Sequence, residues 1–153
     1  MSTPPNSGSD WAQAAFPLAG PFDTDHLIAA CDAIAELVRY VAHATYPVRD
    51  GLRYAPDAYA VLGRLSHAVH SLHQVCEQIG HRLDGMATDP TLRVDQMGRP
   101  AEPAALARWA ADLLTSAGTS CWQMATCLDA AQSATGRLYH HLPPDDAAGG
   151  EQP

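Results

Sequence analysis

The sequence has no lysine, only two phenylalanines and no long apolar run. Its basic residues are nine arginines, against 17 acidic residues, so the formal net charge is −8. We expect no nucleic-acid binding through a basic patch, because phosphate contacts need clustered lysine and arginine. We also expect no membrane association: no stretch approaches the roughly 20 apolar residues of a membrane span, and an acidic surface disfavours anionic lipid.

Sequence signals for secretion, cofactors and catalysis are also missing. The first ten residues contain no basic residue and no apolar segment, which predicts a cytoplasmic protein. There is no glycine-rich phosphate loop and no G-x-S-x-G motif, so no cofactor and no enzyme class is predicted. None of the four cysteines forms a C-x-x-C pair, which favours reduced core thiols over a zinc site or disulfides. They are Cys31, Cys76, Cys121 and Cys127.

Three long helical patterns account for most of the chain. They cover about residues 24–46, 57–85 and 103–142. Asp23 or Thr24 can cap the first, and Pro56 with Asp57 suits the first turn of the second. We expect an N-terminal arm over 11–22 and disordered tails over 1–10 and 143–153, so that 11–142 forms a single domain.

Apolar side chains recur every three or four residues in each pattern, as on one face of a helix. We predict an all-α antiparallel bundle of these three long helices. The predicted core stripe of the second helix contains Leu62, Leu65, Val69, Leu72, Cys76, Ile79, Leu83 and Met86. The predicted core stripe of the third contains Leu106, Ala110, Leu113, Ala117, Cys121, Met124, Leu128, Ala131, Thr135, Leu138 and Leu142.

The opposite face of the third helix is also poor in charge. A solvated face should be charged, so small residues around a tryptophan indicate a docking surface. We predict a partner interface there, with Trp122 as its anchor. The predicted interface residues are Ala111, Leu114, Gly118, Trp122 and Ala125. Gly118 also marks a point at which this helix could kink or break.

The second helix carries a row of histidines that offers a different interpretation. His70, His73, Glu77 and His81 stand at spacings that metal ligands on a helix can use. Most of them point away from the predicted core stripe, whereas metal sites in bundles point inward. A solvated polar face is therefore the simpler interpretation, and a metal or small-ligand site is the alternative.

The sequence thus favours a non-enzymatic interaction or accessory protein. It would self-associate as a homo-oligomer, or bind a protein partner, through the back of the third helix. The alternative is a helical bundle that binds a metal or small ligand through its histidine face. A catalytic bundle would need converging polar groups in the core, and the predicted core positions are almost wholly apolar.

Overall fold

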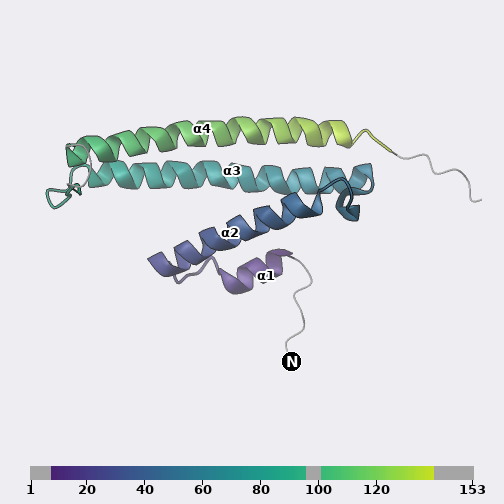
Figure 1. The fold of residues 1–153 in the computed structure, drawn as a ribbon, viewed down its shortest axis with the longest axis horizontal. Coiled ribbons are helices and arrows are strands. Elements are labelled where there is room, and N and C mark those ends of the chain that lie inside the picture. Colours follow the sequence, from purple (N-terminus) through teal and green to yellow (C-terminus); the bar gives the residue numbers. More distant parts are fainter. Residues whose placement is uncertain (1–7, 96–100, 140–153) are drawn as a thin grey trace, which may run out of the picture. The chain divides into compact units, whose positions relative to one another are not determined.

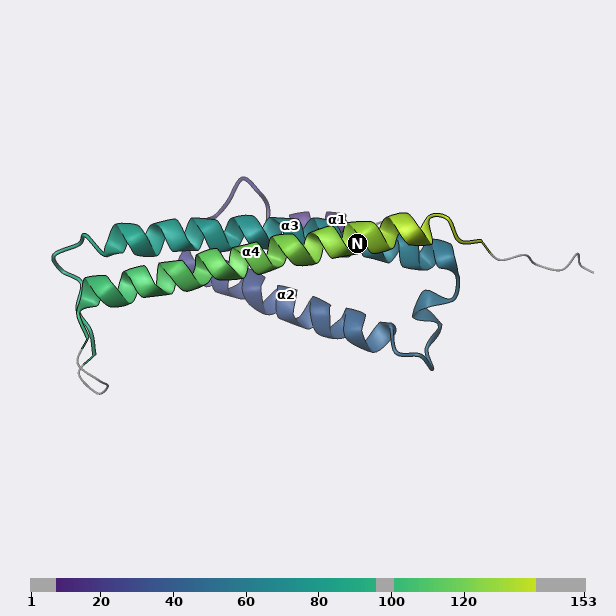
Figure 2. The same ribbon diagram turned by 90° about the horizontal axis from the view of Figure 1, so that it is seen from above.

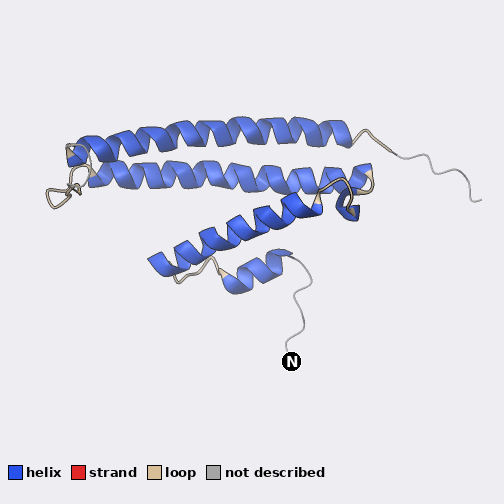
Figure 3. Cartoon of the chain, viewed as in Figure 1, coloured by secondary structure: helices blue, strands red, loops and turns tan. Residues whose placement is uncertain are grey.

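The computed structural model describes residues 8–95 and 101–139, and it contains no strand in these ranges (Figures 1 and 3). The predicted all-α class is confirmed. In chain order the helices are α1 (Gly8–Ala15), α2 (Thr24–Ala44), the short 3₁₀ helix η1 (Asp50–Leu52), α3 (Ala55–Met86) and α4 (Pro103–Thr135). Within the described ranges, no helix combines the length and apolarity needed to cross a bilayer.

The chain divides into two compact units, Met1–Leu52 and Arg53–Pro153. The first contains α1, α2 and η1. Helix α1 begins at Gly8, so it includes the last residues of the predicted tail. It continues to Ala15, so the first part of the predicted irregular arm is helical. Phe16 and Phe22 line a small apolar pocket together with Leu27 of α2. Residues 1–7 and 140–153, which include most of the predicted tails, lie outside the described residues.

Helix α2 begins as predicted, at a side-chain cap. The Asp23 carboxylate accepts a hydrogen bond from the His26 backbone N–H at 2.9 Å, which satisfies one of the free donors of the first turn. This bond, followed by the one with the His26 side chain, lowers the pKa of Asp23 below its ordinary value. The cap is therefore present at neutral pH and is lost only as the pH falls through this lowered pKa.

The second unit is an antiparallel hairpin of α3 and α4, which run side by side along their length (Figures 1 and 2). Helix α3 starts at a capping box, in which the Asp57 carboxylate accepts from the Tyr54 backbone N–H at 2.9 Å. Its bounds agree with the predicted 57–85. The packing of α3 on α4 is the part of the predicted bundle that the structure contains.

The buried contact between α3 and α4, here called the seam, uses small residues of α4. Its buried positions are Ala111, Gly118 and Ala125, one every seven residues. On α3 the buried positions are Ser66, Val69 and Gly80. A β-carbon built on Gly80 would lie 3.6 Å from the Ala111 carbonyl oxygen, so the two backbones approach closely.

The core stripe predicted for α4 is only partly right. Cys121 and Leu128 are half-buried, whereas Leu106, Leu113 and Met124, also predicted as core, are 41%, 50% and 48% exposed. Small residues occupy the seam because they let two helices approach, whereas the larger side chains would hold them apart. On α3 the prediction is half right: Leu62, Val69, Cys76 and Leu83 face the seam, but Leu65, Leu72, Ile79 and Met86 flank it.

Helix α4 runs without a break through Gly118 and ends at Thr135, seven residues before the predicted end. Gly118 does not kink the helix because it is packed against α3, where a β-carbon would meet His73 and Cys76. Gly136 is the C-cap residue, after which the chain turns with short-range backbone hydrogen bonds from Arg137 and Leu138. Its φ of −62° is right-handed, so this helix end is not the left-handed glycine cap that a sequence commonly signals.

Candidate functional site

The seam separates two flanks of the hairpin that differ in chemistry. One, the polar side, carries His70, Glu77 and Asp84 on α3, and Asp112 and Asp129 on α4. Positions that recur every seven residues keep to one flank of such a seam. The other, the apolar side, therefore carries Leu65, Leu72, Ile79 and Met86 of α3 opposite Leu106, Ala110, Leu113, Ala117 and Met124 of α4.

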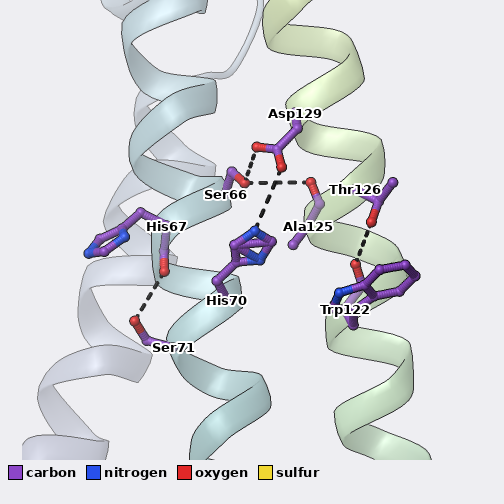
Figure 4. Close-up of polar contacts among 8 residues, drawn as sticks. All are labelled: Ser66, His67, His70, Ser71, Trp122, Ala125, Thr126 and Asp129. Carbon is purple, nitrogen blue, oxygen red and sulfur yellow. Dashed lines mark hydrogen bonds and ion pairs between the residues drawn. The ribbon is translucent and has the colours of Figure 1, made fainter.

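A polar network at the seam joins α3 to α4 on the polar side (Figure 4). The Ser66 hydroxyl, only 3% exposed, donates to the Asp129 carboxylate at 2.5 Å. It also lies 3.5 Å from the Ala125 carbonyl oxygen. His70 Nε2 stands 3.7 Å from the other oxygen of Asp129. The sequence analysis assigned no role to Ser66 or Asp129, although Ser66 falls on the three–four spacing of Leu62, Val69 and His73.

This network has the residue types of a hydrolase site but not the arrangement. A serine nucleophile needs a base that takes its proton and a substrate that can reach its oxygen. Here the hydroxyl faces a carboxylate, His70 pairs with Asp129 rather than with Ser66, and the oxygen is buried in the seam. The geometry supports a structural role, that of joining two helices through a charge-assisted hydrogen bond.

The predicted metal ligands are only partly brought together. His73 Nδ1 donates to the Gly118 carbonyl oxygen at 3.0 Å, while its Nε2 lies 3.5 Å from Glu77. His81 and Glu77 line a shallow groove of about 330 Å³ on the polar side, which Asp84 and Asp112 also border. His70 lies beside Asp129. Over 8–95 and 101–139, no group of three or more histidine, cysteine or carboxylate side chains could hold a metal ion.

Most of the predicted partner-interface residues face α3 within the hairpin. Ala111, Gly118 and Ala125 are buried in the seam, and Leu114 is half-buried beside Gly80. A second protein has no access to these four while the hairpin is intact. Trp122 differs: it is 56% exposed and stands outside the space between the helices (Figure 4). It is two turns from Asp129 along α4, at the edge of the polar side.

The large exposed side chains of the hairpin gather instead on the apolar side. Towards the connection between α3 and α4 they form a patch, here called the distal patch. It contains Ile79 and Met86 of α3 with Leu106 and Leu113 of α4, which are 41–50% exposed. Trp109, which the sequence analysis overlooked, is one turn from both leucines at the outer edge of the patch and is 59% exposed.

No protein-family model, no curated protein and no solved structure matches this chain. The two flanks of the hairpin are the surfaces through which this chain could act. The polar side offers hydrogen bonds that hold α3 to α4. The distal patch offers apolar surface that its own hairpin leaves in contact with solvent, and such surface is typical of protein interfaces.

Proposed function

We propose that this protein is a non-enzymatic interaction protein that self-associates through the distal patch. The observation that carries the proposal is the presence of four large apolar side chains, half exposed, on two neighbouring helices. Removing such side chains from water is the main favourable term in association. Trp109 at the edge supplies the residue type that most often dominates interface energies. The docking surface thus moves from the back of α4 to the side of the hairpin.

A second copy of the chain suits this patch better than a charged partner. Glu77, Asp84 and Asp112, the acidic residues near this end of the two helices, all border the groove on the polar side. Two copies with a net charge of −8 can meet on the apolar side without bringing these carboxylates together. A twofold axis through the patch would place the same residues on both partners, giving four helices at the contact.

A specific dimer at this patch needs to bury about 1,000 Å² in total, the lower end for specific interfaces. Such an interface depends on a few central side chains. Leu113, half exposed and next to Trp109 along α4, is the residue whose replacement should matter most.

The proposal predicts that wild-type protein has the mass of a dimer and that Leu113→Glu has the mass of a monomer. Because the dimer would bury two carboxylates without partners, its dissociation constant should rise at least about 100-fold. Light scattering after size exclusion measures the mass, and circular dichroism checks that the helices remain. Ser116→Glu, on the same helix and exposed, is the matched control and should remain dimeric.

Trp122→Glu separates this surface from the one predicted from the sequence. If the distal patch is the contact, Trp122→Glu stays dimeric. A monomeric wild-type protein at high concentration would contradict self-association. A dimer that survives Leu113→Glu but dissociates with Trp122→Glu would instead place the contact around Trp122, at the edge of the polar side.

We further propose that α2 completes the predicted three-helix bundle by covering the remainder of the apolar side. At 1.5 Å per residue, the 21 residues of α2 span about 31 Å, whereas the 32 residues of α3 span about 48 Å. Helix α2 ends one short connection before α3 begins, so it would cover the half of the hairpin nearer that connection. The distal patch would then stay open for the second copy.

The exposed thiols of Cys31 on α2 and Cys127 on α4 offer a direct test of this cover. A short bismaleimide should link them within one chain, because both lie on the apolar faces that the bundle would bring together. Peptide mapping of the monomeric band identifies the link. If Cys31 and Cys127 are linked only between two different chains, the proposal that α2 covers the hairpin of its own chain is wrong.

A further inference from the structure

Two of the four cysteines lie in the seam and two do not. Cys76 of α3 and Cys121 of α4 are half-buried at facing positions, whereas Cys31 and Cys127 are exposed. A β-carbon built on Gly118, one turn before Cys121, would lie 3.6 Å from the Cys76 β-carbon. The Cys76 side chain is therefore packed against the turn of α4 that leads to Cys121.

The two thiols are neighbours across the seam. Burial raises the pKa of the Cys76 thiol, and the neighbouring Cys121 raises that pKa further. Cys76 therefore stays protonated at neutral pH and is not an isolated reactive thiolate. What distinguishes Cys76 is that the sulfur of Cys121 lies close to its own sulfur.

The small residues of the seam make a covalent bridge geometrically accessible. Packed helix axes lie about 8–10 Å apart, and each Cα lies about 2.3 Å from its axis. Facing Cα atoms are then about 3.5–5.5 Å apart, and disulfides require Cα atoms within about 7 Å. Ala111, Gly118 and Ala125 keep the axes at the short end of this range.

We propose that Cys76 and Cys121 form an oxidisable pair that closes into a disulfide between α3 and α4. With hydrogen peroxide as the oxidant, one thiol sulfur is oxidised to a sulfenic acid and releases one water molecule. The second thiol attacks that sulfur, the S–S bond forms, and a second water molecule leaves with the sulfenic oxygen and the thiol proton. Two thiols and one peroxide thus give one disulfide and two water molecules.

The bond would fasten the two helices near the middle of the seam. It would add a covalent link between two helices that the chain otherwise connects through residues 87–102, so it would restrict the unfolded chain and stabilise the hairpin. The reaction leaves the apolar side unchanged, and it is independent of the proposed self-association.

The test uses the full-length chain with Cys31→Ser and Cys127→Ser, which keeps only the seam pair. After limited hydrogen peroxide and blocking with maleimide, unreduced digestion should yield a Cys76–Cys121 linked peptide. The melting temperature should rise by several degrees and return on reduction. The matched control is the same chain with Cys121→Ser added. In this control, neither the linked peptide nor the rise in melting temperature should appear.

Two results would overturn the proposal. One is the absence of the linked peptide at a peroxide dose that fully oxidises the exposed thiols of the wild-type chain. The other is a linked peptide whose formation leaves the melting temperature unchanged or lower, because a seam that must distort to make the bond is not built to accept it.

Discussion

Ala125→Leu is expected to lower the free energy of unfolding by about 3 kcal/mol, the upper range for overpacking a buried site. Ala125 is fully buried, with 0% of its surface exposed, and it packs beside Ser66 of α3. A leucine there must push the two helices apart or adopt a strained rotamer. Chemical denaturation followed by circular dichroism measures the change.

Ala117→Leu is the matched control, since it makes the same change two turns earlier on the same helix. Ala117 is exposed on the apolar side, so the expected change is within about 0.5 kcal/mol. The pair discriminates between the two possible cores of α4: the predicted core stripe contains Ala117, and the seam contains Ala125. Greater destabilisation by Ala117→Leu would mean that the predicted stripe is the true core.

Ser66→Val is expected to lower the free energy of unfolding by about 2–4 kcal/mol, an effect of similar size. The substitution removes the hydrogen bond to Asp129, which is worth about 1–2 kcal/mol because the carboxylate is half exposed. It also adds bulk where only 3% of the residue is exposed. The same denaturation measurement applies, and Ser71→Val on the exposed face of α3 should have little effect.

A double-mutant cycle isolates the hydrogen bond from the bulk. Ser66→Ala and Asp129→Ala should each destabilise the hairpin, and the double variant should lose about 1–2 kcal/mol less than their sum. His70→Ala should change stability little, because its 3.7 Å pair with Asp129 is half exposed. Additive effects of Ser66→Ala and Asp129→Ala would show that the contact contributes no free energy.

Local signals in the sequence were sufficient to predict where α2 and α3 begin, but they did not predict α1. Asp23 caps α2, and Pro56 with Asp57 begins α3, because a carboxylate before or within a first turn satisfies free backbone donors. Gly136 ends α4, and the prediction overran it because the three–four spacing continues through Leu138. Spacing reports which residues share a face, but it does not report where the helix stops.

The face of α4 that meets α3 could not be predicted from side-chain size. Leu106, Leu113 and Met124 are among the most apolar residues of that helix, so a hydrophobicity argument assigns them to the core. A hairpin of two helices, however, has a narrow contact, and the small residues Ala111 and Gly118 bring the backbones closest. The choice between faces depends on the partner helix, which the pattern of α4 alone does not contain.

The candidate site was predictable to a similar extent. The expectation that α4 carries unpaired apolar surface stays a prediction, now centred on Leu113 and the neighbouring Trp109 rather than on Trp122. The histidine spacing correctly predicted that His73 and Glu77 lie close together along one side of α3. It could not reveal that His73 bonds to Gly118 of α4 or that His70 pairs with Asp129, because both partners come from the other helix.

The small residues of the seam also determine how the hairpin should open. A layer built from alanine, glycine or serine buries little apolar area, so each layer contributes only a small part of the total free energy. Stability then accumulates with the number of layers, as it does along a repeat array. Such a hairpin opens progressively from its free end near Gly136, and its amide protection should increase along α4 from Thr135 back towards the centre.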